Sequence, residues 1–286
     1  MTYIHELAEW PEFTWDMQAL AKALAAVRHK QGRHLGKMEA LGFELRTEAS
    51  LTALTNEVVK SSAIEGESLD TDEVRSSIAR KLGLDVAGLP KPGREVEGIV
   101  EMMVDATQNF DQLLTPERLY GWHAALFPTS RSGMVRITVG ALRRGESGPM
   151  QVVSGPMGKE RVHFQAPDAG RLGEEMERFL VWFNRSPDVD PVLKAAVAHL
   201  WFVTIHPFDD GNGRIARALG DYVMLVHGFY YDVIMTDYKD HYLDSLEACS
   251  LLDAKPLSTF LEFSYLETLG RVAGFFSIVE QEDKRR

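Results

Sequence analysis

One stretch of twelve residues restricts the fold of this chain more than any other: residues 206–217 read His-Pro-Phe-Asp-Asp-Gly-Asn-Gly-Arg-Ile-Ala-Arg. Apolar residues recur at helical spacing on both sides of it, namely Leu193, Val197, Leu200 and Val203 before it and Ile215, Leu219, Tyr222 and Val226 after it. No strand pattern precedes the stretch and no Lys-Ser or Lys-Thr follows it, which argues against a P-loop. The sequence therefore predicts a loop between two helices in a mainly α-helical chain.

The residue types in this loop suit a phosphate group. Glycines let backbone N–H groups converge into an anion-binding nest, and a helix that begins near Asn212 turns its positive end toward it. Arg214 and Arg217 can each clamp phosphate oxygens. Asp210 offers the carboxylate that a divalent cation prefers, and His206 can accept a proton near neutral pH. A polar interhelical loop would explain any one of these residues, but the whole set predicts transfer of a nucleotide group.

The stretch resembles the HPFx(D/E)GNGRxxR signature of Fic-domain proteins without a mismatch, and the resemblance extends roughly over residues 48–271. It implies a Fic-type helical bundle with a small β-hairpin flap, and transfer of AMP from ATP to a hydroxyl side chain (Tyr, Thr or Ser) of a protein. The opening segment resembles the N-terminal extension of stand-alone bacterial members. We therefore expect an N-terminal helical region at 1–90 with an inhibitory helix, a Fic catalytic domain at 91–276 and a charged tail at 277–286.

The resemblance also implies roles for single residues. His206 would be the base that deprotonates the target hydroxyl, Asp210 the Mg²⁺ ligand, and Phe208 an anchor in the core. The expected contacts with the phosphates of ATP come from Gly211, Asn212, Gly213 and Arg214, with Arg214 on the terminal phosphate and Arg217 supporting the loop or the phosphates. The kinase-like branch of the family has a lysine at the position of Gly213, so its absence favours AMP transfer.

A tyrosine-bearing helix borders the adenine pocket in the family. Residues 237–250 are expected to form this helix here, and Tyr242 is the expected adenine contact. Tyr238 is an alternative, and a tyrosine packed in the core is equally compatible with the pattern.

A second functional signal is the segment Ser61-Ser62-Ala63-Ile64-Glu65-Gly66. By itself it indicates a helix end with a glycine cap. Fic proteins, however, use the pattern (S/T)xxxE(G/N) as an inhibitory segment. Ser61 and Glu65 are four residues apart and therefore share one helix face. The resemblance implies that Glu65 reaches Arg214 and fills the space needed by the terminal phosphate of ATP.

Residues 131–168 interrupt the helical pattern. Their short β-prone runs are 135–139, 151–153 and 162–164. A turn at 155–158 between the last two runs predicts a β-hairpin. The resemblance makes the hairpin at 150–165 a flap for a protein target, because a strand edge can hold an extended peptide by main-chain hydrogen bonds. Gly133 and Arg136 match a lead-in of the family and are interpreted as structural.

The rest of the sequence predicts helices and contains no repeat. The expected helices are 16–41, 48–65, 71–82, 95–110, 116–126, 169–184, 237–250 and 257–276. Thr115 and Pro116 are typical of a helix start, and the glycines and prolines of 83–94 indicate a linker. The aromatic residues of 10–15 are expected to pack the first helix onto the body.

Composition limits the partners. The net charge of −11 argues against nonspecific nucleic-acid binding, although a local basic pocket suffices for ATP. The sequence has neither an apolar run that could span a bilayer nor the pattern of a signal peptide, so we expect no membrane contact and a cytoplasmic location. Cys249 is the only cysteine, which excludes a disulfide within the chain. Members of the family often dimerise, which leaves a homodimer open.

Three functions remain open from the sequence. The favoured one is a Mg²⁺-dependent protein adenylyltransferase held in check by Glu65. The first alternative is the reverse reaction at the same site, with Glu65 positioning water to release AMP from a modified protein. The second is a regulatory protein with a degenerate nucleotide site, and the intact His206, Asp210 and Arg214 argue against it.

Overall fold

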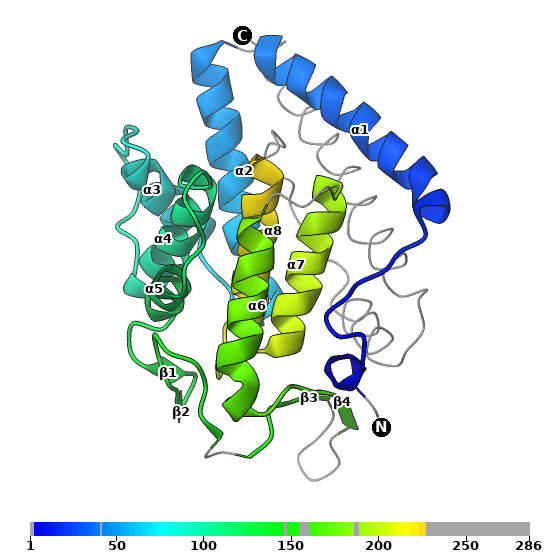
Figure 1. Cartoon of the computed structure of the whole chain (residues 1–286). Helices are drawn as coiled ribbons and strands as arrows, with labels where there is room; N and C mark the ends of the chain where they lie inside the picture. The colour runs from blue at the N-terminus through cyan, green and yellow to red at the C-terminus, as the bar shows by residue number, and fades with distance from the viewer. Residues whose placement is uncertain (1–2, 41, 146–147, 155–160, 186–188, 227–286) are drawn as a thin grey trace.

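The structure is a computed structural model that describes residues 3–40, 42–145, 148–154, 161–185 and 189–226 (Figure 1). Its α-helices are α1 (Met17–Ala40), α2 (Phe43–Ile64), α3 (Thr71–Lys81), α4 (Arg94–Gln108), α5 (Pro116–Leu126), α6 (Leu172–Asn184), α7 (Pro191–Ile205) and α8 (Asn212–Val226). Two 3-10 turns, η1 (Ile4–Glu6) and η3 (Ala169–Arg171), precede α1 and α6. The four short strands are β1 (Arg131–Ser132), β2 (Val135–Arg136), β3 (Gln151–Ser154) and β4 (Arg161–Gln165).

The prediction of a mainly α-helical fold is confirmed, and most helix ends lie within two residues of their expected positions. The clearest start is that of α5, where the Thr115 hydroxyl accepts the Arg118 N–H at 3.2 Å and Pro116 takes the first helical position. The largest difference is in α2, which begins at Phe43 rather than at 48. The helices expected at 237–250 and 257–276 lie outside the described residues.

Helix α7 is almost completely buried. All its residues from Val192 to Ile205 are buried except Lys194. The Asp190 carboxylate caps its N-terminus by accepting the Val192 N–H at 2.8 Å. Helix α8 packs along α7, and α2, α4 and α5 also contact α8 (Figure 1). Because both α7 and α8 are buried, the loop between them starts and ends at rigid positions.

The N-terminal aromatic residues pack onto this core, as predicted. Trp10 and Phe13 contact the ring of Trp201 in α7, with centroid distances of 6.0 and 5.7 Å. The indole N–H of Trp10 donates to the carboxylate of Glu175 in α6 at 2.9 Å, which satisfies both buried polar groups. The segment before α1 is therefore attached to α6 and α7.

The strands form two separate antiparallel pairs, β1–β2 and β3–β4, at the end of the bundle where the chain leaves α7 (Figure 1). The predicted strands at 151–153 and 162–164 are confirmed, while the turn at 155–158 lies outside the described residues. The β-prone run at 135–139 is a strand only in its first two residues. The residues after Arg136 do not continue the strand, because the Thr138 N–H donates to the Asp209 carboxylate at 2.8 Å.

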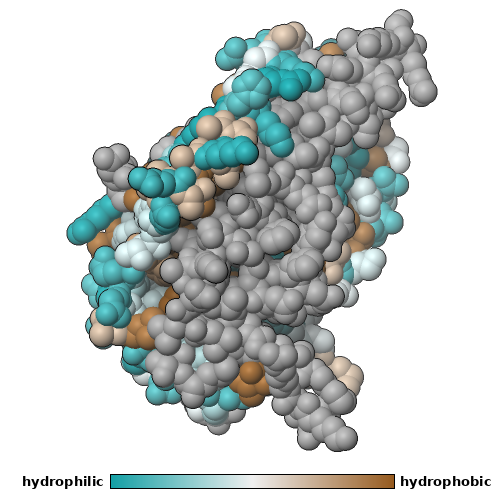
Figure 2. All heavy atoms as spheres, turned by 90° about the vertical axis from the view of Figure 1, so that its right-hand side faces the viewer, coloured by the Kyte–Doolittle hydropathy of each residue, from teal (hydrophilic) through white to brown (hydrophobic). Residues whose placement is uncertain are grey.

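No helix among the described residues is long and apolar enough to cross a membrane. On the face shown in Figure 2, the described residues present hydrophilic and hydrophobic side chains side by side.

Candidate active site

The loop between α7 and α8 is held closed by its own side chains. The Asn212 amide accepts the Phe208 N–H at 3.0 Å and donates to the Phe208 carbonyl at 2.9 Å. Phe208 is fully buried, as expected of an anchor. His206 and Gly211 have positive φ angles of 50° and 79°, which lets the chain reverse in few residues. The Asn212 side chain is thus committed to the loop, and only its backbone N–H is left for the phosphate contact expected of this residue.

His123 of α5 supports the loop from behind, and sequence reasoning missed it because a single histidine on a helix carries no signal. Its ring stacks on Phe208 with centroids 4.2 Å apart. Nδ1 accepts the Gly140 N–H at 3.1 Å, so Nε2 carries the hydrogen and donates to the Asp210 carbonyl at 3.2 Å. Burial lowers the pKa of His123 to about 4, so this neutral form persists at pH 7.

His206 is the C-cap of α7, and its ring is half-buried. Nδ1 lies 3.2 Å from the Val203 carbonyl, and a carbonyl can only accept, so Nδ1 carries the hydrogen. Nε2 then keeps a free lone pair. Burial lowers the pKa of His206 to about 4, with a further lowering by Arg143, while Asp210 and Glu65 oppose the shift. The ring is therefore neutral at pH 7 and can accept a proton at Nε2.

The carboxylate of Asp210 is oriented by two donors. Oδ1 accepts the Gly211 N–H at 2.6 Å, and Oδ2 accepts the hydroxyl of Ser132 from β1. No group of three or more potential metal-binding side chains occurs among the described residues. A Mg²⁺ ion held by one carboxylate takes its other ligands from phosphates and water, so Asp210 fits that mode of binding and not an all-protein site.

Glu65 meets the first turn of α8 directly. Its Oε1 lies 2.7 Å from Nη2 of Arg217. The side chain of Arg217 is only 2% exposed, and it also donates to the hydroxyl and the carbonyl of Ser61 at 2.7 and 2.9 Å. A side chain at Gly213 would collide with the same carboxylate oxygen. The Glu65 carboxylate thus occupies the positive end of α8, where an anion is most favoured.

The expected pairing of Glu65 with Arg214 is wrong. Nη1 of Arg214 instead lies 2.7 Å from the carboxylate of Glu67, and its guanidinium lies over the ring of Phe127. Arg214 and Arg217 are both buried, and their guanidinium groups bond to different carboxylates. Sequence reasoning missed Glu67, although the Glu-Gly-Glu order of residues 65–67 was a usable signal.

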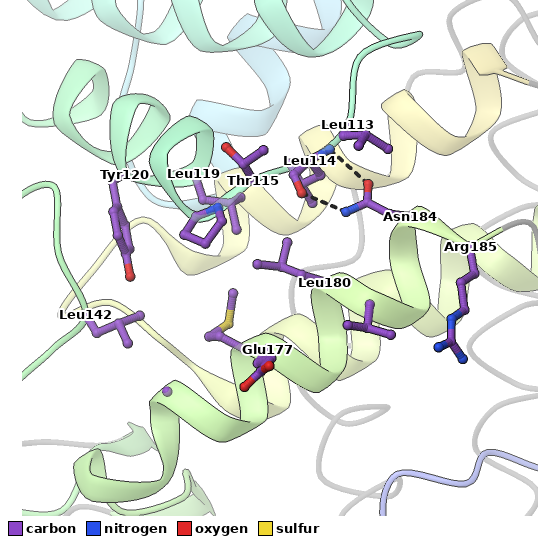
Figure 3. A pocket seen from close by; sticks show the side chains of 14 residues that line it. Leu113, Leu114, Thr115, Leu119, Tyr120, Leu142, Glu177, Leu180, Asn184 and Arg185 are labelled. Atoms are coloured by element: carbon purple, nitrogen blue, oxygen red, sulfur yellow. Dashed lines mark hydrogen bonds between the residues drawn. The ribbon is translucent and has the colours of Figure 1, made fainter.

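An apolar groove of about 680 Å³ lies apart from these residues, between the start of α5 and helix α6 (Figure 3). The Asn184 side chain bonds to the N–H and carbonyl of Leu114 at its edge, at 2.9 and 2.8 Å. None of the predicted site residues lines this groove. Tyr242 and Tyr238, expected near the adenine, lie outside the described residues, as does Cys249.

Two known families match parts of this chain. Residues 113–224 match the Fic/DOC family, and residues 3–84 match a domain of unknown function, DUF4172. The domain boundary expected at residue 90 stays a prediction.

Two curated relatives are named protein adenylyltransferases. The protein adenylyltransferase fic-1 of Caenorhabditis elegans is 26% identical over 202 residues, which cover 70% of this chain and 37% of that protein. The protein adenylyltransferase Fic of Culex quinquefasciatus is 28% identical over 232 residues, or 79% of this chain and 43% of that protein. The chain thus spans less than half the length of either relative.

Solved structures share the fold. A Fic family protein from Desulfovibrio desulfuricans G20 superposes with a TM-score of 0.67 at 23% identity, covering 92% of this chain and 76% of that chain. A Fic domain containing signaling protein from Bacteroides thetaiotaomicron gives 0.62 at 22% identity, covering 86% of this chain and 93% of that chain. Residues 113–224 thus match the Fic/DOC family, and the helical bundle with its small hairpins has the fold of the solved Fic structures.

Proposed function

We propose that the chain is a protein adenylyltransferase, which transfers AMP from ATP to a hydroxyl side chain of a target protein. The observation that carries this proposal is the neutral ring of His206, with its free Nε2, on the same loop as an anion-binding helix end. Arg214 and Arg217 add two buried positive charges there. The names of the curated relatives support the same activity.

The residues suit each part of this reaction. The target hydroxyl gives its proton to Nε2 of His206, and its oxygen forms a bond to the α-phosphorus of ATP. The bond from that phosphorus to the bridging oxygen of the β-phosphate breaks, and pyrophosphate leaves. The backbone N–H groups at the start of α8, including those of Asn212 and Gly213, lack partners within the helix and can hold phosphate oxygens.

Asp210 is the residue proposed to hold Mg²⁺ with the phosphates. Its oriented carboxylate supports this role, because hydrogen-bonded ligands keep their direction when a cation binds. The ion, when bound, neutralises part of the charge on the phosphates. Gly213, where a lysine marks the kinase-like branch, supports transfer of AMP rather than of the terminal phosphate.

The sheet β3–β4 is proposed to hold the target. Its two strands pair only with each other among the described residues, and the Gln165 carbonyl of β4 already lies 2.7 Å from Nε2 of His5, so the outer edge of β3 is the one proposed to pair with an extended peptide. Such pairing contacts the backbone of the target and leaves its hydroxyl side chain free to approach His206.

We also propose that Glu65 inhibits the enzyme, with Glu67 as a second contributor. Glu65 holds Arg217 and fills the anion position at Gly213, and Glu67 holds Arg214. The two carboxylates are partly solvent-exposed (32% and 44%) while the arginines are buried, so the carboxylates can withdraw without moving α8. Inhibition would thus be released by a small movement of the chain after α2.

The decisive experiment compares ATP labelled at the α-phosphate with ATP labelled at the γ-phosphate, using the Glu65→Gly variant. We expect the α-label alone to appear on the protein itself and on targets in a lysate. The double variant Glu65→Gly/His206→Ala is the control and should transfer neither label. Absence of the α-label from every protein would contradict the proposal. Removal of AMP from a modified target by the parent, lost in Glu65→Gly, would identify the reverse reaction instead.

A further inference from the structure

Arg143 is a buried arginine that contacts the backbone of the catalytic loop. It lies between the two hairpins, and only 4% of its surface is exposed. Its Nε donates to the carbonyl of His206 at 2.7 Å, and its own backbone N–H donates to the carbonyl of Pro207 at 2.9 Å. Its Nη2 donates to the carbonyl of Pro167, two residues after β4 ends. All three bonds go to main-chain carbonyls.

These bonds bear on the conformation of His206. The residue has φ 50° and ψ 59°, a left-handed conformation that is uncommon for a residue other than glycine and needs support from its surroundings. Its N–H donates to Phe202 at 3.0 Å, which fixes the peptide plane before Cα. Its carbonyl accepts from Arg143, which fixes the plane after Cα. With Nδ1 bonded to Val203, the direction of the ring is then determined.

A guanidinium suits this place better than other side chains. It presents several N–H groups in one rigid plane, so one group can bond to two carbonyls from different segments. Burial lowers the pKa of Arg143, and the charges of Asp209 and Asp168 offset part of this shift. Among the described residues, the hydrogen bonds of this buried charge go to carbonyls, and such a charge is costly to keep, which indicates a role beyond filling space.

We propose that Arg143 is a positioning residue, which holds His206 in its reactive orientation and at a fixed place relative to Pro167 at the base of the β3–β4 sheet. The inference rests on the proposed function. Arg143 touches neither the nucleotide phosphates nor the reacting hydroxyl in this role. Its loss should therefore slow the chemical step and leave ATP binding intact.

The test uses Arg143→Gln and Arg143→Lys in the Glu65→Gly background, with steady-state kinetics of AMP transfer. Arg144→Gln is the matched control, because Arg144 is the exposed neighbour. We expect Arg143→Gln to lower kcat about 10–100-fold, since a small misplacement of a catalytic group has effects of this order, with KM for ATP within about twofold of the parent. Arg143→Lys should recover part of kcat, because its side chain, longer than that of glutamine, ends in a positively charged ammonium that can still reach and donate to one of these carbonyls. The control should match the parent.

Thermal unfolding of each variant shows whether it is folded, and kinetics are compared only between folded proteins. An unchanged kcat in folded Arg143→Gln would overturn the proposal. Equal loss in folded Arg143→Gln and Arg143→Lys would overturn it as well, because packing alone would then explain the effect. If Arg143→Gln does not fold, the test uses Arg143→Lys alone. A kcat for Arg143→Lys equal to that of the Glu65→Gly background would then contradict the positioning role. Failure of the Glu65→Gly background to transfer AMP at all would instead reject the proposed function.

Discussion

The carboxylate of Glu65 at the end of α2 lies 2.7 Å from the guanidinium of Arg217 in α8, and it abuts Gly213 in the first turn of that helix. One side chain thus neutralises an arginine and covers the helix end that would receive a phosphate. The two residues are 152 positions apart in the chain, so this relationship depends on the packing of α2 beside α8.

Glu65→Gly should raise self-labelling with ATP by at least about tenfold, because correct positioning of the phosphates supplies much of the rate of group transfer. Binding of ATP should also raise the melting temperature more than in the parent, since ATP then offers the missing partner of Arg217. Adding Arg217→Ala should abolish the gain in labelling. Unchanged or lower labelling in Glu65→Gly would contradict the inhibitory role.

Glu67→Gln should raise labelling less than Glu65→Gly does. Glu67 is more exposed than Glu65, and it is the Glu65 carboxylate that abuts Gly213, so Glu67 blocks less of the anion position. Quantitative labelling of parent, single and double variants measures both effects. Glu73→Gln is a control outside the site. A Glu67→Gln variant identical to the parent would restrict inhibition to Glu65.

His206→Ala should lower AMP transfer by about 10²–10⁴-fold, the usual effect of removing a positioned general base. Phosphate contacts come from other residues, so the affinity for ATP with Mg²⁺ should stay within a few-fold of the parent. Calorimetric titration checks binding, and α-labelled ATP checks transfer. Transfer at the parental rate would reject His206 as the base.

Asp210→Asn should remove most of the Mg²⁺ dependence of ATP binding and reduce turnover strongly. The substitution keeps the size of the side chain and removes the charge that attracts the cation. Titration of ATP binding at several Mg²⁺ concentrations is the measurement, with Asp209→Asn as a matched neighbour. If the Mg²⁺ titration curves of the parent and of Asp210→Asn superimpose, Asp210 is not the Mg²⁺ ligand and only supports the structure of the loop.

The free energy of unfolding should fall as pH drops from about 6.5 to about 4. In the folded protein the pKa values of His123 and His206 are lowered to about 4, so the unfolded chain binds protons first as the solution becomes acidic. The contribution of these two histidines to the free energy of unfolding is therefore complete above pH 6.5. It is lost between pH 6.5 and about 4, and it does not change further below pH 4. Urea unfolding across the range should give a shallower dependence for His123→Gln than for the parent.

The pH dependence of AMP transfer follows from the same shift. With its pKa near 4, His206 is already unprotonated at pH 6, so its loss as a base should reduce kcat/KM only near pH 4. A decline of kcat/KM centred near pH 6.5 would instead show that His206 has an ordinary pKa in the free enzyme.

The order of the helices was predictable because its causes are local. Helical periodicity identified α7 and α8, and Thr115 with Pro116 marked the start of α5. The loop at 206–217 was predictable for the same reason, since its residues are contiguous. The strand pattern at 135–139 failed because Thr138 bonds to Asp209, a contact 71 residues away that outweighs strand propensity.

The sequence by itself determined the helical fold class and the residues of the loop, because periodicity, capping and the signature act over a few neighbouring positions. Only the tertiary structure decided that Glu65 pairs with Arg217, that Glu67 holds Arg214, and that Arg143 and His123 hold the loop. The physical reason is geometric. An ion pair or a buried hydrogen bond needs its atoms within about 3 Å, and the rotation of one helix against another, set by the whole core, decides which side chains come that close.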